Sequence, residues 1–145
     1  MNELFEVRQG ELVLGVVRHP LGPNNVMSSW RLIQLQLPGG RRARYLVGDV
    51  NGQAHVCPDV IRIDLHTLRA EVGSGRVYEL QDPGHDFDAD FLLVYWMRLN
   101  SISQAKDLTR AVLRLKARRA RASDVARQGS PANANGRRPR QARLF

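Results

Sequence analysis

Three acidic residues, Asp86, Asp88 and Asp90, have the alternate spacing with which a calcium-binding loop begins. The sixth and twelfth positions of such a loop require glycine and glutamate, and here they hold Phe91 and Met97. Short acidic side chains ahead of an apolar run are typical of a helix start, where free backbone amides donate to them. The spacing therefore predicts helix capping rather than a metal site.

His55 and Cys57 are a second candidate for metal binding, because both would share one face of a strand. Asp59 or His66 could complete a zinc site, but the sequence has one cysteine and no paired cysteine spacing. The Gly-Ser-Gly run at 73–75 is too short for the turn that exposes a catalytic serine, and no glycine-rich phosphate loop is present. We expect no catalytic residue, no cofactor and no metal, and hence a binding protein rather than an enzyme.

Positive charge is concentrated in the last part of the chain. Residues 106–145 hold twelve of the 22 Lys and Arg side chains and two acids, a net charge of +10, whereas residues 1–105 carry −2. Arginine binds phosphate oxygens in pairs, and such clusters bind DNA or RNA irrespective of sequence. A solvated charged surface is the alternative. The candidate nucleic-acid-binding residues are Arg114, Lys116, Arg118, Arg119, Arg121, Arg137, Arg138 and Arg140.

The last five residues, 141–145, read Gln-Ala-Arg-Leu-Phe. They resemble the peptide by which bacterial polymerases and repair factors dock on the sliding clamp. Leu144 and Phe145 are adjacent large apolar side chains in a polar tail, and a partner's pocket would bury them. The resemblance implies that Gln141, Leu144 and Phe145 bind the clamp or another protein with a hydrophobic pocket. An ordinary tail that ends in Leu-Phe is the alternative.

A smaller basic patch at 41–44 holds three arginines beside Tyr45, and Trp30 could add a stacking surface as in barrels that bind single strands. Nothing in the sequence places Trp30 and Tyr45 on the same face as the arginines. We therefore favour core packing for both aromatic side chains.

The acidic side chains of the first part suggest a rival function. Asp82, Asp86, Asp88 and Asp90 could mimic phosphate groups on an inhibitor from a phage or mobile element. Such a protein would block a host defence or replication complex through its body, without its tail.

Residues 3–81 have the pattern of an antiparallel sheet or partial barrel of six or seven strands. Apolar and polar residues alternate at 31–37 and 42–47, which is the period of half-buried strands. Turn residues separate the runs at 38–40, 51–52 and 73–75. The apolar phase flips within 60–72, so we expect one long strand with a bulge or break near His66 and Thr67.

The period changes to a helical one after residue 84. Asp88 is the expected N-cap of a helix through Leu99, which is apolar nearly all round and should be buried. Ser101 and Gln104 form a capping box that predicts a second helix, continuing as a basic rod to about Arg127. The composition of residues 129–136 cannot bury a core and predicts disorder.

Part of the chain has a second resemblance. The residues that carry it are the run from Ser74 to Leu80, Pro83 and Gly84, the run from Asp88 to Phe91, Trp96, Asn100 and the run from Asp107 to Thr109. Residues 74–109 resemble small uncharacterised bacterial proteins often found near mobile elements. The resemblance implies a hairpin packed against a helix pair and implies no activity.

The expected fold class is α+β. We expect one domain over 1–128, β-rich at 1–82 and with a two-helix hairpin at 83–128, followed by a disordered basic tail at 129–145. No apolar run approaches the roughly 20 residues that span a bilayer, and the acidic start lacks the features of a signal peptide, so we expect the cytoplasm. The sequence favours a non-catalytic, DNA-associated accessory or adaptor protein.

Overall fold

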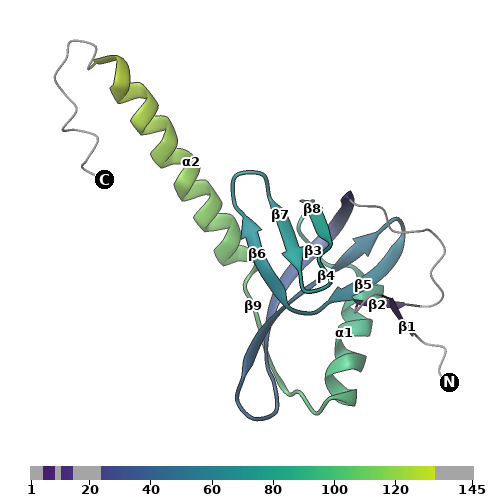
Figure 1. The fold of residues 1–145 in the computed structure, drawn as a ribbon. Helices are drawn as coiled ribbons and strands as arrows, with labels where there is room; N and C mark the ends of the chain where they lie inside the picture. Colours follow the sequence, from purple (N-terminus) through teal and green to yellow (C-terminus); the bar gives the residue numbers. More distant parts are fainter. Residues whose placement is uncertain (1–4, 9–10, 15–23, 133–145) are drawn as a thin grey trace. The chain divides into compact units, whose positions relative to one another are not determined.

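The computed structural model describes residues 5–8, 11–14 and 24–132 (Figure 1). The chain divides near Arg110 into two compact units. The first unit contains the sheet and one helix, and the second contains the greater part of another helix. The two units are described separately below.

In the described residues nine strands form one mixed sheet. The strands are β1 (Phe5–Arg8), β2 (Glu11–Leu14), β3 (Asn24–Gln36), β4 (Arg42–Val50), β5 (Gln53–Cys57), β6 (Val60–Asp64), β7 (Arg69–Val72), β8 (Val77–Gln81) and β9 (Gln104–Asp107), and the helices are α1 (Phe87–Leu99) and α2 (Thr109–Ala132). The strand order is β1-β2-β5-β4-β3-β8-β7-β6, with β9 paired to β3. Within these ranges the sheet is not closed into a barrel, since β1 and β6 form its ends. The predicted α+β class is confirmed.

Two turns show how local sequence determines the hairpins, and only the first of them was expected as a turn. Asn51 and Gly52 have positive φ angles of 57° and 81° and join β4 to β5, as the Asn-Gly pair predicts. The expected single strand over 60–72 is wrong, because the break near His66 is a tight turn between β6 and β7. In this turn the backbone amides of His66 and Thr67 donate to the Asp64 carboxylate, which lowers its pKa below the ordinary value.

β3 is the central strand, and it bends. Its pairing with β4 shifts register between Ser28 and Arg31, and Ser29 has a positive φ of 49°. The first part of β3 pairs with β8, and this pairing is parallel, unlike the other pairings of the sheet. The second part lies between β4 and β9. The bend therefore lets β8 and β9 share one edge of the same strand.

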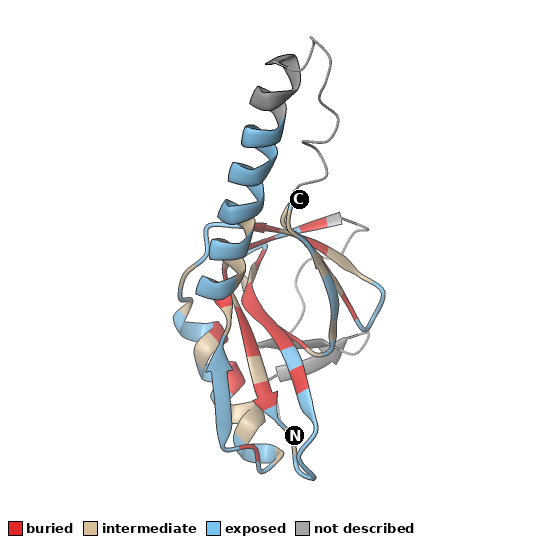
Figure 2. Cartoon of the chain, turned by 90° about the vertical axis from the view of Figure 1, so that its left-hand side faces the viewer, coloured by how far each residue is buried: buried red, intermediate tan, exposed pale blue. Residues whose placement is uncertain are grey.

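α1 packs on one face of β4 and β5. Its buried residues Ala89, Leu92 and Leu93 join a cluster with buried side chains of the sheet. The Trp96 indole donates to the Tyr45 hydroxyl over 3.4 Å. The predicted complete burial of this helix is wrong, because one side of α1 contacts the sheet and the other side is exposed (Figure 2).

A further group of buried side chains includes Met27, Trp30 and Tyr78, each fully buried. His55 points away from α1 and meets Tyr78 of β8 with ring centroids 6.4 Å apart. Gly48 makes room for this packing, since a Cβ at that position would come within 2.6 Å of the Met27 Cγ atom.

The starts of both helices differ from the prediction. Asp86, rather than Asp88, is the N-cap of α1, and its carboxylate accepts a hydrogen bond of 2.9 Å from the Ala89 amide. Ser101 does not cap a helix, because it has a positive φ of 56° and residues 104–107 form the strand β9 instead of a helix. α2 starts later, at Thr109, and ends at Ala132, beyond the predicted end near Arg127.

Candidate nucleic-acid interface

Three neighbouring strands, β4, β3 and β9, present long polar side chains on one face. In β4, Arg42 and Arg44 are exposed, while Ala43 and Tyr45 are buried. Strand pairing places Arg44 opposite Gln34 and Gln34 opposite Lys106, and in the next row it places Arg42 opposite Gln36 and Gln36 opposite Gln104. We call these six residues the polar face: Gln34, Gln36, Arg42, Arg44, Gln104 and Lys106.

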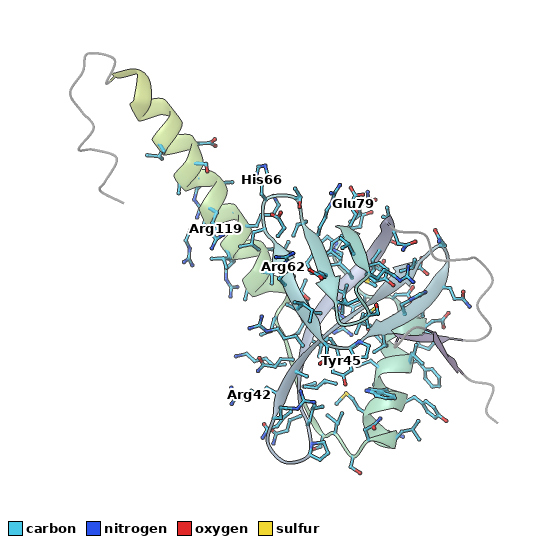
Figure 3. All side chains as sticks on the ribbon, in the orientation of Figure 1. Arg42, Tyr45, Arg62, His66, Glu79 and Arg119 are labelled. Atoms are coloured by element: carbon cyan, nitrogen blue, oxygen red, sulfur yellow. The ribbon has the colours of Figure 1, made fainter. Side chains whose placement is uncertain are left out.

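The alternation of β3 and β4 produces this face. Ile33 and Leu35 lie opposite Tyr45 and Ala43, and all four side chains are buried in the cluster beneath α1. Because successive side chains of a strand point to opposite sides, the residues between them project away from α1. Arg42 and Tyr45 can be followed on β4 in Figure 3.

Two surface hollows adjoin the polar face, and both include Arg42. The larger, about 500 Å³, is lined by Arg41 to Arg44 on one side and by Asp59, Val60, Ile61 and Gly73 on the other. The smaller, about 220 Å³, is lined by five other residues, which are Gln34, Gln36, Gln104, Ala105 and Lys106. Arg42 therefore connects two recesses that a ligand could enter together.

The polar face combines three cations with three amides and contains no acid. Arginine can donate two parallel hydrogen bonds to one phosphate, and lysine adds a point charge. Glutamine amides can donate to phosphate or to sugar oxygens. The arrangement suits an extended polyanion that lies across the strands.

Aromatic stacking is not available on this face among the described residues. Trp30 is fully buried, and Tyr45 is 6% exposed and points toward α1. The idea that these rings stack on bases next to the arginines is therefore wrong, and core packing is confirmed. Any nucleic acid here would be held by its backbone.

Arg31 lies on the opposite side of β3 from the polar face and joins three elements. Its guanidinium pairs with Asp90 of α1 and, over 3.2 Å, with Asp107 of β9. His85 also contacts Asp90, at 3.1 Å. Partial burial would raise the pKa of Asp107, but hydrogen bonds from Thr109 and the charge of Arg31 outweigh it and lower the pKa. This network fixes β9 beside β3 and so positions Gln104 and Lys106, a third of the polar face.

α2 carries every predicted nucleic-acid-binding residue that the structure describes. Arg114, Arg118 and Arg121 project within about 60° of one another around the helix axis, given about 100° per residue. Lys116 and Arg119 project from the other side. Every residue from 117 to 126 is exposed (Figure 2). The five candidates thus divide into a stripe of three arginines and an opposite pair.

The remaining candidates lie outside the described residues. They are Arg137, Arg138 and Arg140 of the basic tail and Gln141, Leu144 and Phe145 of the proposed docking peptide.

The other candidate metal ligands from the sequence are not part of the polar face, although Asp59 lines the larger hollow beside it. His55 and Cys57 are buried, while Asp59 and His66 are exposed. In the residues that the structure describes, no three His, Cys, Asp or Glu side chains gather as a metal site would require.

Sequence analysis missed the contribution of β9 to the site. Gln104 and Lys106 were assigned to a helix, and Gln34 and Gln36 had no candidate role. The regular alternation of β3 was the available signal, because it places both glutamines beside Arg42 and Arg44 once β3 and β4 form a hairpin.

The chain matches no family model, no curated protein and no solved structure in the comparisons made. Neither α1 nor the described length of α2 is long and apolar enough to cross a membrane.

Proposed function

We propose that this chain is a non-catalytic, nucleic-acid-associated accessory protein. The observation that carries the proposal is the acid-free polar face, in which Arg42, Arg44 and Lys106 are aligned with three glutamines. The stripe on α2 supplies further arginines for phosphate. Both surfaces bind the sugar-phosphate backbone of the nucleic acid. The affinity is therefore independent of the base sequence and falls steeply as the salt concentration rises.

The test of this proposal is fluorescence anisotropy of the full chain with labelled duplex DNA, single-stranded DNA and RNA over a range of salt. Arg42→Gln/Arg44→Gln should weaken binding about tenfold and reduce the salt slope by about two, since each lost phosphate contact removes about one. Arg62→Gln/Arg69→Gln on β6 and β7 removes the same charge elsewhere and serves as the control. Equal losses in both double variants would contradict a specific role for the polar face.

The proposal includes a protein partner for the tail. Gln141, Leu144 and Phe145 dock in the hydrophobic pocket of a bacterial sliding clamp, supported by the Gln-x-x-Leu-Phe pattern and by the apolar pair within a polar segment. A clamp encircles DNA, so docking there brings the arginines close to a duplex. The proposed setting is the cytoplasm of a bacterium, in replication or repair or on a mobile element.

Surface plasmon resonance on immobilised clamp tests this part separately. Leu144→Ala/Phe145→Ala should weaken binding at least about tenfold, as expected for loss of an anchor pair. Arg143→Gln, within the same segment, should retain it. Clamp binding that is unchanged in the Leu144 and Phe145 variant would contradict the docking role without affecting the polar face.

The rival inhibitor function has less support from the side chains that suggested it. Asp86 caps α1 and Asp90 pairs with Arg31 and His85, so two of the four acids are engaged within the fold. We therefore do not propose phosphate mimicry.

A further inference from the structure

α1 exposes an apolar side that the sheet does not cover. Phe87 is 83% exposed, Leu99 56%, Val94 48% and Phe91 46%. Tyr95 is half-buried and stacks on Phe91 with ring centroids 6.4 Å apart. We call these five residues the outer stripe. Aromatic side chains gathered on one surface are typical of an interface.

Two charges flank the outer stripe at its opposite ends. Asp88 lies in the first turn of α1 and Arg98 in the last turn. Both are exposed, and neither forms an ion pair with any described residue. The stripe is thus apolar along its length, acidic at its start and basic at its end.

We propose that the outer stripe binds the outer stripe of a second copy of this chain in antiparallel orientation. A two-fold axis at the level of residue 93 places Phe87 opposite Leu99 of the copy and Phe91 opposite Tyr95. The same axis places Asp88 opposite Arg98, and each pairing occurs twice because the contact is isologous.

The charge pattern is the reason to choose a second copy as the occupant. A parallel arrangement would place like charges together at both ends of the pair. The antiparallel arrangement matches both ends at once and also opposes the two helix dipoles. An interface of one helix per copy falls at the small end of the known size range, so the dimer should be weak and depend on concentration.

Sedimentation velocity of the full chain, without nucleic acid, tests the inference. The wild type should shift from monomer to dimer as its concentration rises from about 5 to about 200 μM, the range for a micromolar dissociation constant. Phe91→Asp should remain monomeric at every concentration. Phe91→Asp changes neither Thr109 nor the polar face. The outcome of the anisotropy test for nucleic acid is therefore independent of the outcome of this test.

Charge reversal tests the orientation. Asp88→Arg and Arg98→Asp should each weaken dimerisation about tenfold, because like charges then meet at both ends. The double variant Asp88→Arg/Arg98→Asp should restore it to near the wild-type constant. The double reversal is the least favourable charge arrangement for α1 itself, so recovery cannot come from a more stable helix.

Two outcomes would overturn the inference. A wild-type chain that stays monomeric up to the highest concentration excludes the pairing, as when another part of the same chain covers the stripe. A dimer that the double reversal fails to restore excludes the antiparallel register. Circular dichroism of each variant checks that it is folded.

Discussion

The two faces of β3 and β4 differ by a single step along each strand. Ile33, Leu35 and Tyr45 are buried beneath α1, while their neighbours Gln34 and Arg44 project from the other side. One face therefore supports the fold and the other is available for a ligand. The alternation holds over residues 33–36 of β3 and 42–45 of β4, and farther along both faces are buried, as Leu32 and Leu46 are. Within the alternating part, the proposed binding residues can be changed without removing a core side chain.

The largest effect should come from the buried side. Leu35 is fully buried, so Leu35→Ala should lower the free energy of unfolding by about 3 kcal/mol through lost burial and the cavity left behind. Gln34→Ala, one residue earlier, should change it by no more than about 0.5 kcal/mol. Urea denaturation measures both. Similar losses for the two variants would mean that the two faces contribute equally to the free energy of unfolding.

Gly48 lies where the face of β4 that carries Arg42 and Arg44 becomes part of a packed core. Gly48→Ala should destabilise the protein by about 1–3 kcal/mol, because its Cβ would overlap Met27 and lie 2.9 Å from the Ser28 carbonyl oxygen. Thermal unfolding measures the loss. Gly52→Ala at the exposed turn is a useful contrast, since it meets no neighbouring atom and is strained only by its positive φ. A neutral Gly48→Ala would refute the close packing.

Helix α2 allows a similar comparison between its two sides, with variants that remove the same charge. Arg114→Gln/Arg118→Gln should lower nucleic-acid affinity several-fold more than Lys116→Gln/Arg119→Gln, since the first pair belongs to the stripe with Arg121. Both double variants remove two charges from one helix. Anisotropy at one fixed salt concentration measures the difference. Indistinguishable affinities would show that net charge alone matters and that the stripe has no role.

The smallest effect concerns pH. Because the pKa of Asp107 is lowered in the folded chain, its carboxylate contributes stability above the pKa of the unfolded state, and this is lost as pH falls through the folded value. Asp107→Asn should therefore reduce the loss of unfolding free energy between neutral and acid pH by less than about 1 kcal/mol, since the group is partly exposed. Denaturation midpoints at neutral pH and below pH 4 measure it. An equal loss of stability at acid pH in the wild type and the variant would show that the Arg31 network is not coupled to folding.

The two hairpins formed by β3, β4 and β5 could be predicted from sequence because their signals are local. The alternation in β4 and the Asn51-Gly52 turn determine which residues face inward, and both are confirmed. The start of α1 was predicted two residues late, because three alternating acids each fit a capping role and only the fold distinguishes them.

The strand β9 and the parallel β3–β8 pair could not be predicted in the same way. Gln104, Ala105 and Lys106 lack strand-forming character, and Ser101 with Gln104 matches a capping box. These residues form a strand because β3 offers an edge about seventy positions earlier in the chain, with Arg31 and Asp107 fixing the contact. Non-local pairing of this kind overrides local preference. The part of the polar face on β9 was missed for this reason.

The most direct test of the polar face is an NMR titration of the full chain with a short oligonucleotide. The side-chain amide signals of Gln34, Gln36 and Gln104 should shift together as ligand is added, while signals of Leu35 and Tyr45 on the covered face should stay in place. Perturbation that spares the three glutamines while the oligonucleotide binds would contradict the account.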